Sequence, residues 1–381
     1  MRDGLKSTSA PYPWVIETTT TARLERIATD LGAVSFGVTD ASPFRASRST
    51  LQEHRGNGMS GPLHFTYTEP EIATDVTRTF PWARRIVVFA HGYLGGSHHP
   101  ATTGPVVGRF ATKDQYAGVR GIAEGLARAL TADGARAETL IDDNRLVDRA
   151  AAARSGVGWL GKSTMLLAPG HGPWLLLGSV VTDAELETTL PMRRSCGTCA
   201  ACIPACPTAA ITPDGLDARL CISTWLQAPG AIPHWIRPLI ERRIYGCDDC
   251  LTSCPPGFPT MERTDSDPLR LSFAELLDSS DEHLIDRFGW FYVPQRQPRF
   301  LRRNLLVAAG NSEEAEAVGP ILDHFTHRSS LVRGHAYWAL ARSLGEGAWT
   351  PLRRRYSFET VPDALVELER AMLMLRMPHG G

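Results

Sequence analysis

Residues 196–207 read Cys196-Gly-Thr-Cys199-Ala-Ala-Cys202-Ile-Pro-Ala-Cys206-Pro207, the C-x2-C-x2-C-x3-C-P spacing of bacterial ferredoxins. A second group repeats this spacing with its leading cysteine moved upstream: Cys221, then Cys247, Cys250 and Cys254-Pro255. All eight cysteines of the 381-residue chain belong to these two groups. The pattern predicts a ferredoxin-like domain around two [4Fe–4S] clusters, which would conduct electrons to a further redox centre.

The spacing also predicts how the ligands are shared. Three thiolates at x2 spacing can wrap one cluster, and the fourth cysteine points away to complete the other. For one cluster we expect the ligands Cys196, Cys199, Cys202 and Cys254. For the other we expect Cys206, Cys221, Cys247 and Cys250. Two structural zinc sites are the alternative, since C-x2-C pairs also bind zinc, but the C-x3-C-P endings and the count of eight favour iron–sulfur.

Length and composition limit the other possibilities. A chain of 381 residues suggests two or three domains, and 43% hydrophobic residues suffice for a core. A net charge of −1 excludes a polycationic nucleic-acid coat, although a local basic face is compatible with it. The longest apolar stretch, residues 174–181, is too short for a bilayer, and the N-terminal MRDGLKSTSAPYPW lacks the apolar core of a signal peptide. We therefore expect a cytoplasmic monomer with no membrane contact.

Hydrophobic periodicity divides the chain into three parts. Residues 1–190 mix helical segments with apolar runs typical of strands, which predicts an α/β domain. The expected helices are 22–31, 119–130 and 145–154, and the expected strands are 86–90, 139–141 and 174–181. Residues 191–262 form the predicted cluster domain, with many prolines and little periodicity, as expected where metal replaces a hydrophobic core.

Residues 263–381 are predicted to be helical, with helices over 302–309, 313–324 and 331–344. Helix pairs with this rhythm are similar to HEAT-type repeats. Residues 289–381 carry 12 Arg against 9 Asp and Glu, with a cluster at 296–303 and another at 353–355. The clusters predict a phosphate-contacting surface, and solvated helix faces are the alternative.

Residues 156–163 read GVGWLGKS, which satisfies the phosphate-binding loop pattern. We reject that interpretation because a helical segment precedes the stretch, Pro169 follows it closely, and Trp159 would crowd a phosphate. The glycines instead permit close approach to a flat or bulky ligand. Lys162, Ser163 and Thr164 could contact polar groups on its edge.

Taken together, these stretches resemble the epoxyqueuosine reductase family, which modifies tRNA with cobalamin and iron–sulfur clusters. The matching stretches span about residues 140–345 and read SGVGWLGKSTMLL, GPWLLLGSVVTD, CGTCAACIPACPTAAI, LDARLCIS, IRPLIERRIYGCDDC, RRNLLVAAGNS and LVRGHAYWALARSL. The cysteine motif alone is shared with many ferredoxin-like proteins. Its combination with GWLGK upstream and a HEAT-like segment downstream is more specific.

The resemblance implies an enzyme that converts epoxyqueuosine in a tRNA anticodon stem-loop to queuosine. It implies a cobalamin between the N-terminal and cluster domains, reduced to cob(I)alamin through the clusters by an external low-potential electron donor. Asp142 takes the family's position for the acid that protonates the departing oxygen. The implied cofactor contacts are Asp142, Trp159, Lys162, Ser163, Thr164, Ser223 and Asp248. The implied tRNA contacts are Arg299, Arg302 and Arg303.

Asp142 has a second interpretation from its own surroundings. It lies in IDDNR, between a predicted strand and a predicted helix, where Asp and Asn are common helix caps. A role as an acid requires a raised pKa, through burial and the like charge of Asp143. Two other functions stay open on the sequence: a related corrinoid reductase of a small electrophile, and a ferredoxin-like electron carrier with an appended repeat.

Overall fold

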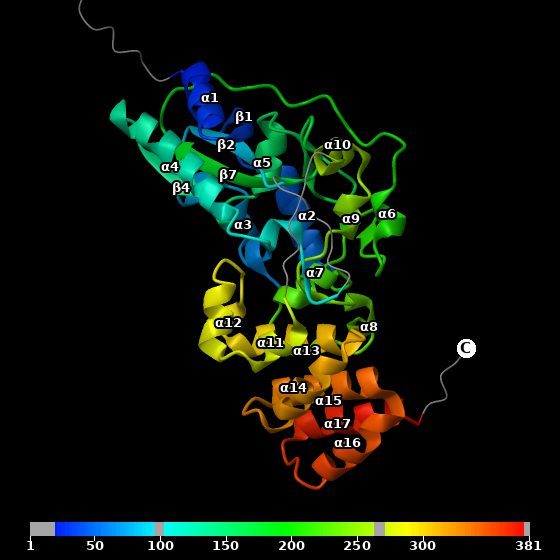
Figure 1. Cartoon of the computed structure of the whole chain (residues 1–381). Helices are drawn as coiled ribbons and strands as arrows, with labels where there is room; N and C mark the ends of the chain where they lie inside the picture. The colour runs from blue at the N-terminus through cyan, green and yellow to red at the C-terminus, as the bar shows by residue number, and fades with distance from the viewer. Residues whose placement is uncertain (1–19, 95–102, 263–270, 377–381) are drawn as a thin grey trace, which may run out of the picture.

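The computed structural model of the chain describes residues 20–94, 103–262 and 271–376. Figure 1 shows an upper lobe, in which helices flank a sheet, and a lower lobe made of helices. The cysteine-rich segment runs along one side of the upper lobe and continues down to the helices (Figure 1). Within these ranges no helix is long and apolar enough to cross a membrane.

A four-stranded sheet forms the centre of the upper lobe. Its order is β1 (Ala33–Asp40), β2 (Arg85–Gly92), β7 (Leu175–Thr182) and β4 (Ala137–Leu140), and every neighbouring pair is antiparallel. Side chains alternate between the two faces of a strand. Val87 and Phe89 of β2 accordingly pack with α1 (Thr21–Asp30) and α4 (Tyr116–Ala132). Ile86 and Val88 face the opposite side, where α5 (Asp148–Arg154) packs. Both faces are covered, which explains the continuous apolar run of this central strand.

The predicted helices and strands of this lobe are present to within a few residues. The largest difference is at α5, which begins at Asp148 rather than at residue 145. Asp143 accepts hydrogen bonds from the backbone and guanidinium of Arg145, which fixes a turn where the helix was expected. Two helices of this lobe were not predicted: α2 (Arg45–Gly56) and α3 (Pro70–Ala73). Phe44, just before α2, packs in the same cluster as α5.

Short elements build the cysteine-rich segment and its neighbours. The helices are α6 (Cys202–Ala205), α7 (Ile222–Gln227), α8 (Arg237–Ile240), α9 (Asp249–Thr252) and α10 (Phe258–Glu262). The strands pair as β5 (Trp159–Leu160) with β6 (Leu166–Leu167), β8 (Ile211–Thr212) with β9 (Gly215–Leu216), and β3 (Val106–Val107) with β10 (Arg243–Tyr245).

The pair β3–β10 joins residues 104–111 to the lower lobe. Arg242 donates to the Gly104 carbonyl at 2.8 Å, and the indole N–H of Trp290 donates to the Ala111 carbonyl at 2.8 Å. The backbone N–H of Gly104 also donates to the carboxylate of Glu314. We call residues 104–111 the strap, because they tie a segment of the N-terminal half to β10, Trp290 and Glu314 of the C-terminal half.

The lower lobe is built around two helices, α13 (Pro298–Asn311) and α15 (Ser330–Leu344). Every residue from 300 to 310 and from 332 to 341 is buried, so both helices are covered on all sides. A Cβ on Gly310 would lie 2.7 Å from Cα of Ala339, so glycine allows the two backbones to meet. Around them lie α11 (Phe273–Asp278), α12 (Asp281–Arg287), α14 (Val318–Asp323), α16 (Trp349–Tyr356) and α17 (Pro362–Met374).

Two features of this lobe differ from the sequence prediction. The single helix expected over 313–324 is a 3-10 turn (Ala315–Ala317) followed by α14, because Pro320 cannot continue an α-helix that begins upstream. The hydrophobic core also extends beyond the predicted domain limit. Ile222, Ile236 and Ile244 from the cysteine-rich segment pack in the same cluster as α13 and α15.

The structure corrects two of the predicted tRNA contacts. Arg302 is 6% exposed and binds Asp281 at 2.6 Å and the Leu277 carbonyl at 3.0 Å. Arg303 is fully buried, and its guanidinium donates to carbonyls of the segment that follows Cys221. Both side chains hold the core together, so the prediction that they contact phosphate is wrong. Arg299 is exposed, and its predicted role stays a prediction.

We expect Arg303→Met to destabilise the protein, because the carbonyls of Trp225, Ala228 and Gly230 lose their donor inside the core. A buried acceptor left without a partner costs about 1–3 kcal/mol. The free energy of unfolding in urea should therefore fall by about 3 kcal/mol or more. The matched control is Arg354→Met at an exposed position, which should stay within about 0.5 kcal/mol of wild type. Equal effects of the two substitutions would contradict the role given to Arg303.

Candidate functional site

Thiols within each predicted ligand set lie close enough to influence one another. Burial, and then the neighbouring thiols of the first loop, raise the pKa of the Cys254 thiol to about 11; these neighbours are Cys196, Cys202 and Cys199. Burial likewise raises the pKa of the Cys250 thiol, with further contributions from Cys247, Cys221 and Cys206. The thiols that act on one another belong to the same predicted ligand set, and the assignment of ligands to clusters stays a prediction. A [4Fe–4S] cluster requires four such thiolates.

The backbone brings donors to these thiols. The N–H of Ala210 lies 3.2 Å from Sγ of Cys206. The backbone N–H groups of Ser223 and Thr224 donate to Cys221, at the first turn of α7. Ser223, predicted to bind a cofactor, thus lies directly against a cysteine of the second group. Its hydroxyl accepts a hydrogen bond from Gln227 at 3.1 Å.

The segment GVGWLGKS forms a hairpin, which confirms that it is no phosphate-binding loop. Gly161 donates to the Met165 carbonyl at 2.9 Å between β5 and β6. Lys162, at the tip, donates to the carbonyls of Gly197 at 3.0 Å and Cys199 at 2.8 Å. Its ammonium therefore holds the first cysteine loop and brings a positive charge to the first thiol group.

Three further residues predicted to contact the cofactor lie in the same hairpin: Trp159, Ser163 and Thr164. Trp159 is buried, and its indole N–H has no hydrogen-bond partner among the described residues. The guanidinium of Arg194 lies 5.7 Å from the centre of its ring. Ser163 is buried, and Thr164 has a φ of 62°, in the left-handed region that non-glycine residues rarely adopt. The Thr164 carbonyl accepts from Arg149 at 2.8 Å.

Asp142 follows strand β4 and has a φ of 48°. Its side chain is open to solvent, yet enough protein surrounds it for burial to raise the pKa of its carboxyl. The charge of Asp148 raises this pKa further, and that of Asp143 does so less; Arg149 opposes both. The Tyr116 hydroxyl is hydrogen-bonded to the carboxylate. An acid with a raised pKa keeps its proton closer to neutral pH, as proton donation requires.

The alternative that Asp142 caps a helix is wrong. Helix α5 begins at Asp148, and its capping position is Val147, which makes no side-chain cap. The carboxylate of Asp143 accepts a hydrogen bond from Arg145 at 2.6 Å, so Asp143 raises the pKa of Asp142 less than expected. Asp148 and Arg149 influence the pKa of Asp142 more strongly, and neither was predicted. The only available signal was the charged Asp-Arg pair at the start of an otherwise alanine-rich segment.

Asp248 connects the second cysteine group to the strap. Its carboxylate accepts from the backbone N–H of Arg109 at 2.6 Å. Burial raises its pKa to about 6, although this hydrogen bond and the charge of Arg109 act in the opposite direction. Tyr245 lies two residues before Cys247 and donates to Gln227 at 3.4 Å. Burial raises its pKa, and the charge of Asp142 raises it further. The second cysteine group and Asp142 therefore share one neighbourhood.

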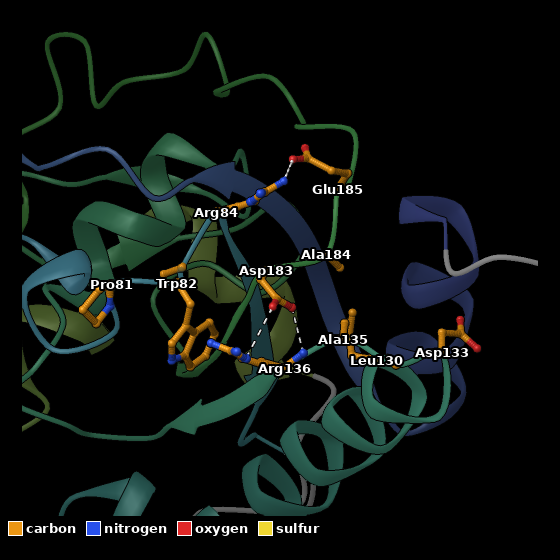
Figure 2. A pocket seen from close by; sticks show the side chains of 12 residues that line it. Pro81, Trp82, Arg84, Leu130, Asp133, Ala135, Arg136, Asp183, Ala184 and Glu185 are labelled. Atoms are coloured by element: carbon orange, nitrogen blue, oxygen red, sulfur yellow. Dashed lines mark hydrogen bonds and ion pairs between the residues drawn. The ribbon is translucent and has the colours of Figure 1, made fainter.

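A separate recess of about 650 Å³ lies near the start of β4 (Figure 2). Asp142 follows the opposite end of that strand. Trp82, Arg84 and Arg136 lie along it. Its two arginines are paired with carboxylates of the same recess: Arg84 with Glu185 and Arg136 with Asp183. The charges of this recess are satisfied within the protein, so we assign it no part in the chemistry.

The eight thiols, together with the carboxyl of Asp142 and its raised pKa, define a class of protein: an iron–sulfur oxidoreductase. Residues 195–257 match the family model of the 4Fe-4S double cluster binding domain. The epoxyqueuosine reductase of Staphylococcus aureus is 30% identical over 356 residues, covering 89% of this chain and 92% of the relative. The crystal structure of a selenomethionine-labelled epoxyqueuosine reductase aligns with a TM-score of 0.84 at 25% identity, over 93% of this chain and 98% of that one.

A second solved epoxyqueuosine reductase carries an epoxyqueuosine-modified stem loop of tRNA-Tyr. It aligns with a TM-score of 0.82 at 26% identity, again over 93% of this chain and 98% of that one. The chain belongs to the epoxyqueuosine reductase family.

Paired cysteine substitutions test which thiols share a cluster. We expect Cys199→Ala with Cys254→Ala to remove one cluster and leave about four of eight irons, because both thiols lie in the first group. Cys199→Ala with Cys206→Ala should remove both clusters, because these thiols lie in different groups. Iron and acid-labile sulfide are measured after anaerobic reconstitution. If the first four cysteines of the chain bound one cluster and the last four bound the other, the first double variant would lose both clusters and the second would lose one.

Proposed function

We propose that this protein reduces epoxyqueuosine in tRNA to queuosine, using electrons delivered through two [4Fe–4S] clusters to a bound cobalamin. The observation that carries the proposal is similarity over about nine-tenths of the chain to epoxyqueuosine reductases, one of them solved with an epoxyqueuosine-modified tRNA stem loop. Converting an epoxide to an alkene consumes two electrons and two protons and releases one water. The site must therefore supply two electrons, which [4Fe–4S] clusters pass one at a time, and protons at the departing oxygen.

Asp142 is the proposed proton donor. Its carboxyl is open to solvent and so can reach a bound substrate, while its raised pKa lets it hold a proton to higher pH than an ordinary aspartate does. The Tyr116 hydroxyl fixes the carboxyl in place. Arg149 limits how far the pKa rises, since its charge stabilises the carboxylate that remains after the proton leaves.

We assign the proposed cobalamin to the side of the protein that carries Asp142. Those that would hold a cobalamin are Asp142, Trp159, Ser163, Thr164, Ser223 and Asp248, with Lys162 fixing the adjoining cysteine loop. The unpartnered indole N–H of Trp159 is a buried donor that a ligand acceptor would satisfy. When bound, cobalamin supplies a low-potential nucleophilic metal, which no side chain can replace.

The lower lobe is the proposed tRNA-binding part. Its buried central helices with flanking shorter ones are similar to a HEAT-type repeat, which presents an extended surface. Arg299, Arg353 and Arg354 are exposed there and can contact phosphate. The base to be reduced would leave its stack to reach Asp142.

Mass spectrometry of tRNA nucleosides tests the activity. Reconstituted protein with cobalamin, a low-potential reductant and epoxyqueuosine-containing tRNA should produce queuosine. Asp142→Asn should retain iron and cobalamin and lose turnover by roughly 10²-fold or more, because the proton donor is gone. Wild-type protein that holds both cofactors and forms no queuosine would reject the function, and full turnover by Asp142→Asn would reject the acid.

The pH dependence of turnover tests which charges set the pKa of Asp142. Turnover requires protonated Asp142, so it should fall as the pH rises through the raised pKa of this group. Asp148→Asn removes a negative charge that raises this pKa, so the fall should begin at lower pH. Asp143→Asn is the matched control and should move the profile less in the same direction. Profiles of turnover against pH that coincide for wild type and Asp148→Asn would contradict this assignment.

A further inference from the structure

The two cysteine groups differ in their access to solvent. In the first loop Gly197, Thr198, Cys199 and Ala200 are all exposed. In the second group the residues next to Cys221, Cys247 and Cys250 are buried, namely Ile222, Gly246 and Leu251. An electron from outside therefore meets the first group before the second.

The surface around the first loop is positively charged. The 26 residues from 188 to 213 include no Asp or Glu, and their two charged residues are Arg193 and Arg194. Both arginines are exposed, and neither forms a salt bridge with a residue that the structure describes. Elsewhere on the surface, arginines such as Arg84 and Arg120 are paired with carboxylates. Lys162 adds a third positive charge, held against the loop carbonyls.

Two exposed apolar side chains lie close in sequence to residues that contact the first loop or its neighbours. Leu160 is 49% exposed and stands between Trp159, over which Arg194 lies, and Lys162, which binds the loop. Phe258 is 41% exposed and follows Cys254, whose thiol faces the first loop, by four residues. Helix α6 packs beside α9, and α6, α9 and α10 lie along one outer edge of the upper lobe (Figure 1). Apolar side chains beside positive charges are a common composition for a protein-binding surface.

We propose that this surface is where a small acidic one-electron carrier protein docks and reduces the first cluster. We call it the docking face and define it by Leu160, Lys162, Arg193, Arg194, Cys199 and Phe258. In the step, the reduced carrier loses one electron and the cluster gains it; no bond forms or breaks and no proton moves. Negative charge on the carrier complements the unpaired arginines and would steer its approach.

The docking face requires iron–sulfur clusters on the cysteines and does not depend on the identity of the final substrate.

Stopped-flow reduction under anaerobic conditions tests the proposal, with a reduced acidic [2Fe–2S] ferredoxin as the probe. The variant Arg193→Glu with Arg194→Glu should lower the second-order rate constant by roughly tenfold or more at low ionic strength and flatten its salt dependence. The matched control is Arg353→Glu with Arg354→Glu, the same change of charge on exposed arginines of α16, which should react as wild type does. Leu160→Ala with Phe258→Ala should slow reduction while keeping the salt dependence, because it removes contact area and no charge.

Cluster integrity is checked independently by iron content and by photoreduction with a neutral deazaflavin, which should be equal in all variants. Equal rate constants for wild type and the Arg193, Arg194 variant would overturn the docking face, as would failure of the ferredoxin to reduce the wild type at any ionic strength. An equal loss in the α16 control would also overturn it, since the effect would then come from total charge. The readout is cluster absorbance, so absence of queuosine formation would reject the proposed function and leave this result standing.

Discussion

Interlocking of cysteines from distant parts of the chain is the constraint on which the rest of the structure depends. The thiol of Cys254 meets those of the first loop, more than forty residues upstream, while Cys206 meets the thiols that follow α8. Between the two groups the chain passes through the core of the lower lobe, where Ile222, Ile236 and Ile244 pack. Closing the first thiol group therefore brings the two ends of that segment together. On this arrangement metal binding and packing of the lower lobe stabilise each other.

The carboxyl chemistry depends on the same arrangement. The second cysteine group brings Tyr245 toward Asp142 and brings Asp248 against the strap. Hairpin β5–β6 reaches the first loop through Lys162, and through Thr164 it reaches Arg149, which moderates the pKa of Asp142. The side chains that deliver electrons and the one proposed to deliver a proton are thus held by a single connected set of contacts.

Much of this could be predicted from the sequence, because the signals were local. Apolar runs identified β2 and β7, helical periodicity identified α4 and α15, and cysteine spacing predicted both thiol groups. The errors came from properties that exist only after packing. The positive charge of Arg302 and Arg303 suggested a surface, but α13 is covered on every side and its guanidiniums bind internal carbonyls. Asp148 escaped prediction because no regular spacing relates it to Asp142; the left-handed turn at Asp142 brings them together.

The strap has a mechanical consequence. Residues 104–111 pair with β10, receive a hydrogen bond from Trp290 and donate one to Glu314, so the two halves of the chain share backbone as well as side-chain contacts. A hinge between the lobes would have to break these bonds together, which opposes opening and closing as a way to admit a macromolecule. On the proposed function, the enzyme is the stiff partner: the nucleic acid must change its own shape to bring its modified base to a preformed site.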